Sequence, residues 1–178
     1  TLEEQTANAS ESLADWDRDL IEQVRQPIIS FQTSDLKVAE PTEGNSLDDY
    51  AQAIGTILTD YNAGLPEGPK SIFIRYLADQ KAEDLAKLNQ AAAHHRAITG
   101  RLLETPVPKA ASNLHRELAT AFGRLTEVVY AMSRIKTDSV IALTNAEIYE
   151  QEYADTIRAM MRVSKFLIDN APATDETN

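Results

Sequence analysis

The stretch that decides the fold is residues 108–136, PKAASNLHRELATAFGRLTEVVYAMSRIK. Its apolar residues recur in alternating steps of four and three, at Leu114, Leu118, Ala121, Leu125, Val128, Met132 and Ile135. This spacing lines them up along one side of a helix and is typical of a helix that packs against partner helices. Pro106 and Pro108 precede the stretch. They predict a hinge, with Pro108 at the first helical position.

Apolar periodicity outside this stretch predicts further helices. The predicted helices cover residues 2–26, 46–62, 70–104 and 139–170. Breakers at Pro27, Pro41 and Gly44 predict an irregular or extended segment at about 27–45. Short connections force neighbouring helices to run antiparallel. We therefore expect an all-α fold, an elongated antiparallel bundle of four to five helices. A single domain is expected over 1–171, with a disordered tail at 172–178.

The composition of the chain argues against several classes of function. The chain has 178 residues, a net charge of −11 and no cysteine. An acidic surface repels phosphate backbones, so no nucleic-acid partner is expected. The absence of cysteine excludes thiolate metal sites and cysteine nucleophiles. No apolar run reaches the ~18 residues of a membrane span, so we expect no direct membrane insertion.

The chain begins with Thr1 rather than Met. We therefore expect that an upstream signal or anchor has been removed.

The histidines suggest one candidate site. If the third and fourth helices fold back about residue 106, His95 and His115 lie at nearly the same height along the bundle. Two imidazoles with a nearby carboxylate such as Glu117 have the donor set of a transition-metal site. The alternative is that both histidines are buried and hydrogen-bonded to neighbours. The Glu-x-x-His repeats of di-iron bundles are absent. No cofactor is predicted.

A second candidate site is a small-molecule cavity. Four polar or aromatic residues are expected near the middle of the bundle, namely His95, Thr99, His115 and Tyr149. Long antiparallel helices can hold a ligand between them and transmit a signal by shifting. The alternative is that the tyrosines belong to the core, with their hydroxyls reaching water. No phosphate-binding glycine loop and no nucleophile-elbow sequence is present, so no enzymatic activity is expected.

Several short motifs carry a resemblance to a known group of proteins. They are TSDLKV at 33–38, YAQAIG at 50–55, VPKAASNLH at 107–115, DSVIAL at 138–143 and Tyr149. Over about residues 31–160 the chain resembles a helical region of uncharacterised exported proteins from candidate-phylum (Parcubacteria-like) bacteria. The resemblance implies export to the cell envelope or an extracellular location, and it carries no catalytic residues.

The leading expectation is therefore a non-enzymatic, exported or cell-surface helical-bundle module for protein interaction or a structural role. Its protein partner is unknown, and it is either a monomer or a homodimer. Two alternatives remain: an extracytoplasmic sensor or small-ligand-binding bundle, and a metal-binding bundle that uses His95 and His115.

Overall fold

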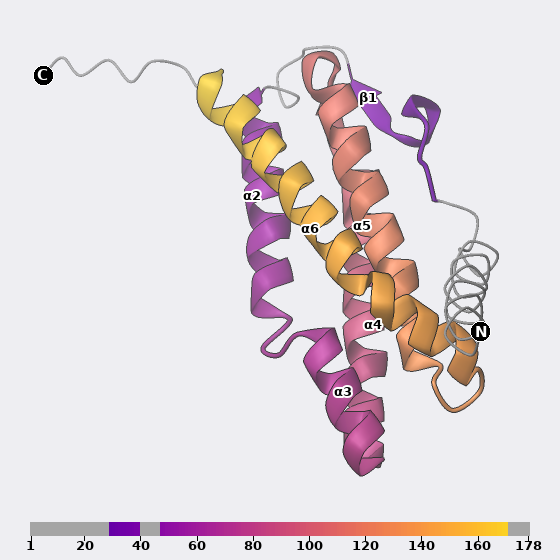
Figure 1. Cartoon of the computed structure of the whole chain (residues 1–178). Helices are drawn as coiled ribbons and strands as arrows, with labels where there is room; N and C mark the ends of the chain where they lie inside the picture. The colour runs from indigo at the N-terminus through magenta and orange to yellow at the C-terminus, as the bar shows by residue number, and fades with distance from the viewer. Residues whose placement is uncertain (1–28, 40–46, 171–178) are drawn as a thin grey trace, which may run out of the picture.

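The computed structural model describes residues 29–39 and 47–170. Within these ranges five α-helices form an elongated antiparallel bundle (Figure 1). The helices are α2 (Leu47–Ala63), α3 (Pro69–Asp79), α4 (Ala82–Glu104), α5 (Ser112–Ser133) and α6 (Ser139–Asp169). The predicted all-α bundle is confirmed. The predicted helix at 2–26 and the tail at 172–178 lie outside the described residues, as do residues 27–28 and 40–45 of the 27–45 segment.

Helix α5 lies between α4 and α6 and explains the 108–136 pattern. Its predicted seam is buried from Leu118 to Ile135, and only Leu114 at its start is partly exposed. Further residues of α5 outside the seam are also buried, namely Ala119, Phe122, Thr126 and Val129. A helix with partners on two sides needs an apolar surface wider than a single seam. The sequence pattern identified one side of α5, and packing against α4 and α6 buries a second.

The predicted helix over 70–104 is wrong in one respect, because it is two helices. Gln80 adopts a left-handed backbone conformation, with φ of 51°, and its N–H donates to the Tyr76 carbonyl at 2.7 Å. Arg75 holds the resulting corner: its Nε donates to Asp84 at 2.9 Å, and its guanidinium also pairs with Glu67. The hydrogen bond from Arg75 holds the pKa of the Asp84 carboxyl below its usual value. A turn at Gln80, stabilised by the ion pairs of Arg75, thus separates α3 from α4.

The proline pair does not open α5 directly. Residues Pro106–Pro108 form a short strand, β2, which pairs in parallel with β1 (Lys37–Ala39), placing Val38 opposite Val107. A 3₁₀ turn over Lys109–Ala111 follows, so Pro108 precedes that turn instead of occupying the first position of α5. Proline has no backbone N–H to donate to a sheet. Among the described residues β2 pairs with one strand, so fewer of its N–H groups are needed and two prolines are tolerated.

The segment before β1 lies along α5. Phe31 N–H donates to Thr120 Oγ1 at 3.2 Å, and Arg124 Nε donates to the Ile29 carbonyl at 3.1 Å. Gly123 makes this close approach possible, since a Cβ there would lie 2.9 Å from both the Ile29 and Phe31 side chains. This part of the predicted 27–45 connection holds a 3₁₀ turn at Thr33–Asp35 and the short strand β1, and is otherwise irregular.

Candidate functional site

His115 is a structural residue at the start of α5. Its side chain is fully buried, with Nε2 2.9 Å from the Leu102 carbonyl and Nδ1 3.1 Å from the Tyr50 hydroxyl. A carbonyl can only accept, so we assign the ring hydrogen to Nε2, and Tyr50 then donates to Nδ1. Burial lowers the pKa of His115 and keeps the ring neutral. Both nitrogens are therefore used to join α2, α4 and α5.

His95 repeats this arrangement further along the bundle. Its Nδ1 lies 2.8 Å from the Ala91 carbonyl, one turn earlier in α4, which fixes the ring hydrogen on Nδ1. Nε2 therefore accepts, and the Tyr61 hydroxyl lies 3.5 Å from it, at the long limit of a hydrogen bond. Burial lowers the pKa of His95 to about 4, with a smaller contribution from nearby His94. At neutral pH the His95 imidazole is uncharged, and its Nε2 can accept a hydrogen bond from the Tyr61 hydroxyl.

The four predicted ligand-binding residues do not form one site. Thr99 Oγ1 lies 2.9 Å from Thr126 Oγ1, which in turn donates to the Phe122 carbonyl at 2.7 Å. Thr99, His95 and His115 are all buried in the core and hydrogen-bonded to protein groups. Tyr149, the fourth, lines a pocket between α2, α3 and α6.

The predicted metal ligands are also apart. His95 contacts Tyr61, whereas His115 contacts Tyr50, eleven residues earlier on α2. His115 also contacts the Leu102 carbonyl, seven residues after His95 on α4, a span of about 10 Å along that helix, which is too far for one metal ion. The expectation of equal height is wrong because residues 105–111 form a strand and a 3₁₀ turn, which shifts the pairing of α4 with α5. Within 29–39 and 47–170 no group of three potential ligands gathers.

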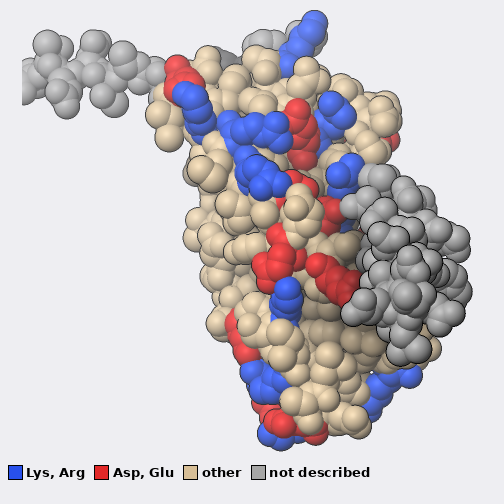
Figure 2. Space-filling model, in the orientation of Figure 1, with Lys and Arg blue, Asp and Glu red and all other residues tan. Residues whose placement is uncertain are grey.

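Glu117, the third predicted metal ligand, lies on the outer face where α6 crosses α5. Its carboxylate pairs with Arg162 of α6 at 3.0 Å. This face carries interleaved basic and acidic side chains (Figure 2), and Arg158 beside it pairs with Asp155. A groove of about 320 Å³ lies here, lined by residues that include Arg116, Arg124, Arg158 and Arg162. Charge pairing between α5 and α6 accounts for the position of Glu117.

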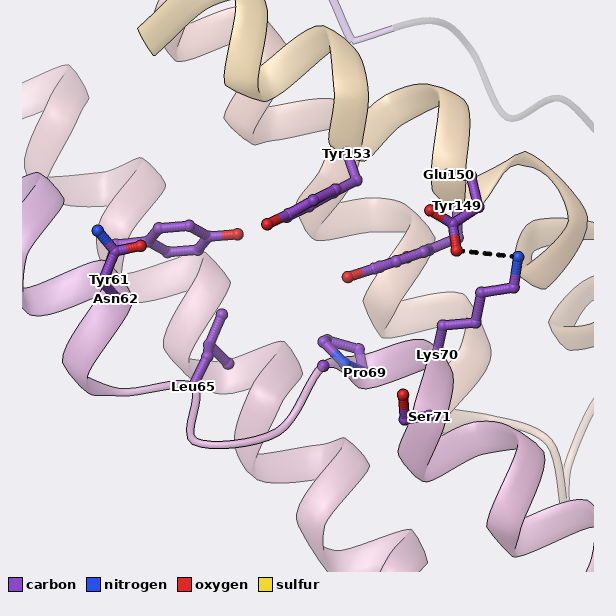
Figure 3. Close-up of a pocket in the computed structure, with 10 residues that line it drawn as sticks. Tyr61, Asn62, Leu65, Pro69, Lys70, Ser71, Tyr149, Glu150 and Tyr153 are labelled. Carbon is purple, nitrogen blue, oxygen red and sulfur yellow. Dashed lines mark ion pairs between the residues drawn. The ribbon is translucent and has the colours of Figure 1, made fainter.

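The best-formed candidate site is a tyrosine pocket of about 330 Å³ where α2, α3 and α6 meet (Figure 3). Tyr61 approaches from α2, and Tyr149 and Tyr153 approach from α6, with their hydroxyls pointing into the space between the helices (Figure 3). The complete lining is Tyr61, Asn62, Leu65, Gly68, Pro69, Lys70, Ser71, Tyr149, Glu150 and Tyr153.

Local sequence explains how these side chains meet. Tyr149 and Tyr153 are four residues apart on α6, so they lie on one face, with ring centroids 5.9 Å apart and planes within 10° of parallel. The Gly68-Pro69 step ends the α2–α3 connection and starts α3, bringing Lys70 and Ser71 to the opposite wall. At the mouth, Lys70 Nζ pairs with Glu150 at 3.1 Å (Figure 3).

The phenols of Tyr61 and Tyr149 remain protonated. Burial raises the pKa of Tyr61 and of Tyr149 above the usual tyrosine value, and the neighbouring tyrosines raise it further. Each hydroxyl can therefore donate and accept one or more hydrogen bonds without carrying charge. The arrangement suits reversible binding of a polar, uncharged group.

Sequence reasoning named Tyr149 as a candidate ligand-binding residue but did not place it beside Tyr61, Pro69 and Ser71. The missing signal is tertiary, because Tyr61, Pro69 and Ser71 come from a different part of the chain and meet Tyr149 only after α6 folds across α2 and α3. Comparisons of the chain with protein-family models, curated proteins and solved structures found no match. No helix within the described ranges has the length and apolar character needed to cross a bilayer.

Proposed function

We propose that the chain is a non-enzymatic, exported helical-bundle module that binds a small organic molecule in the tyrosine pocket. The observation that carries this proposal is the convergence of three phenol hydroxyls, from two separate helices, around one concave space. Ligand sites are typically concave, with apolar walls and a few polar groups that converge. The tyrosine pocket has both, with Leu65 and Pro69 beside the phenols.

The proposal that the module is non-enzymatic is supported by the state of the two buried histidines. His95 and His115 each hold two protein partners and are kept neutral by burial. A general base needs a nitrogen within reach of substrate. In this arrangement the ring nitrogens contact a carbonyl and a tyrosine instead.

Export is proposed from the resemblance of residues 31–160 to exported proteins. Fractionation of the source cells is expected to place the protein in the envelope or outside the cell. Its recovery from cytosol alone would contradict export.

Binding at the pocket is tested by ligand-observed NMR with a library of small organic fragments. We expect a subset of fragments to bind the wild type and to lose their signal with Tyr153→Ala, because that change removes one wall of the pocket. The matched control is Tyr130→Ala. Tyr130 is 37 % exposed on α5 and Tyr153 is 38 % exposed, so both changes remove similar surface, but Tyr130 lies outside the pocket. If no fragment separates the two variants, the pocket is not a binding site.

A second candidate function is protein interaction through the C-terminal half of α6. Ile157, Met161, Ser164 and Ile168 follow one another at steps of four, three and four, the spacing of a helix–helix seam. Met161 is 65 % and Ile168 75 % exposed, and they line an open apolar groove of about 520 Å³. Exposed apolar patches of this kind mark interaction sites. The spacing favours one kind of occupant, an amphipathic helix of a protein partner.

This candidate is tested by placing a photo-crosslinking amino acid at position 161 in the source cells. A discrete adduct with one protein is expected, because the seam would bring the partner helix within reach. The control position is Glu147, which is exposed on the same helix but outside the seam. An adduct with a second copy of the chain would instead identify a homodimer. Equal labelling from both positions would argue against a specific seam.

A further inference from the structure

We propose that the tyrosine pocket takes a neutral, polyhydroxylated ligand, a saccharide unit. The inference rests on the proposed function, since it names the chemical class of ligand for the same site. Three features of the pocket carry it: the charge of the lining residues, their hydrogen-bonding capacity and the apolar surfaces between them.

The first feature is the absence of net charge in the lining. Of the ten residues that line the pocket, Lys70 and Glu150 are the charged ones, and they pair with each other at the mouth. A charged ligand would have to leave water without an opposite charge to receive it, which is costly. The groove between α5 and α6, with its four arginines and its acidic side chains, presents the opposite environment. A neutral ligand fits the tyrosine pocket better than an ionic one.

The second feature is the number of groups that both donate and accept hydrogen bonds. The Tyr149 and Tyr153 phenols and the Ser71 hydroxyl do so through one atom, and the Asn62 amide does so through two. Hydroxyl groups on a ligand have the same dual character, so a polyol can satisfy several of these groups at once. A ligand with acceptors alone, or donors alone, would leave some of them unpaired.

Tyr61 adds direction to this set. Because His95 Nδ1 donates to the Ala91 carbonyl, Nε2 must accept, and the Tyr61 hydrogen points toward it. The lone pairs of the Tyr61 oxygen are then available to a ligand hydroxyl that donates from the pocket. Burial of His95 keeps it neutral at physiological pH, so this orientation persists there.

The third feature is the apolar surface. The rings of Tyr149 and Tyr153 are nearly parallel, and Leu65 and Pro69 lie across the pocket from them (Figure 3). Sugar rings carry C–H groups on their faces and hydroxyls around their edges. Aromatic and proline side chains can pack against the C–H groups, and the phenol hydroxyls can form hydrogen bonds with the sugar hydroxyls. A volume of about 330 Å³ lies at the small end of ligand sites, which favours one sugar ring or a disaccharide over a larger molecule.

Isothermal titration calorimetry tests the ligand class. The probes are the methyl glycosides of glucose, galactose and N-acetylglucosamine, with glucuronic acid and glucosamine as charged comparators. We expect saturable binding of at least one neutral glycoside, and at least tenfold weaker binding of both charged sugars. Equal or tighter binding of a charged sugar at the pocket would overturn the proposal, as would the failure of every neutral glycoside to bind.

Three variants link the binding to the pocket. Tyr153→Ala is expected to weaken the neutral glycoside at least tenfold, and Tyr61→Phe about fivefold or more because it removes the accepting oxygen. Tyr130→Ala is expected to leave the affinity unchanged. If fragments bind at Tyr153 while no neutral sugar does, the ligand class is wrong and the proposed function stands. If neither fragments nor sugars bind there, both fail.

Discussion

Replacing Phe122 by alanine is expected to lower the free energy of unfolding by about 3–5 kcal/mol, the usual cost of removing a fully buried aromatic ring. Phe122 lies on α5, has no exposed surface, and meets Tyr61 edge to face with ring centroids 5.0 Å apart. Its removal leaves a cavity between α5 and α2 that the rigid helices cannot close. Urea unfolding followed by circular dichroism measures the change.

The matched control for Phe122→Ala is Val140→Ala on α6. Val140 is largely exposed, so its truncation is expected to change the free energy of unfolding by no more than about 0.5 kcal/mol. A loss below about 1 kcal/mol for Phe122→Ala would contradict the packing described here. The same variant removes the support behind Tyr61, so it is also expected to weaken any ligand of the tyrosine pocket.

The second large effect is a loss of stability in mild acid that depends on His95. Its pKa is about 4 in the folded chain and about 6.5 in the unfolded chain. Between these values the unfolded state binds more protons, so the free energy of unfolding falls as pH falls from about 6.5 toward 4. A difference of this size corresponds to roughly 3 kcal/mol. His115, whose pKa is lowered in the same direction, adds to the loss.

A pH series of urea unfolding curves for the wild type and His95→Gln separates this effect from the titration of carboxylates. Glutamine does not titrate, so the variant lacks the contribution of His95 while keeping every acidic residue. The variant is expected to be less stable than the wild type at neutral pH, and the gap is expected to narrow as pH falls toward 4. A gap that stays constant over this range would show that His95 does not stay neutral in the folded state.

The sequence predicted the helices well where a single periodic pattern ran without interruption. Residues 108–136 are the clearest case, because the seam on α5 needs only local spacing to be recognised. The break at Gln80 was missed because no glycine or proline marks it. One available signal was the step of eight positions from Leu77 to Leu85, since the apolar stripe of a continuous helix needs a residue between them. Leu77 is in fact exposed, and Tyr76 takes its place in the core.

The candidate site was predictable only in part, for a physical reason. Burial of His95 and His115 was one of two alternatives that the sequence left open, and a buried imidazole needs partners for both nitrogens. Which groups supply those partners depends on how far α4 slides along α5, and the strand and 3₁₀ turn at 106–111 set that offset. Periodicity carries no information about such an offset. The same limit applies to the tyrosine pocket, which forms only where three helices cross.

The pairing of β1 with β2 has a consequence for the order in which the chain assembles. Val38 and Val107 lie opposite each other although 69 positions separate them in the chain (107 − 38). Closing a loop of this length costs more entropy than joining α4 to α5 or α5 to α6 through short turns. We therefore expect the helical hairpins to form before the two strands pair. Attachment of residues 29–39 to the helical bundle is thus expected to be a late event in folding.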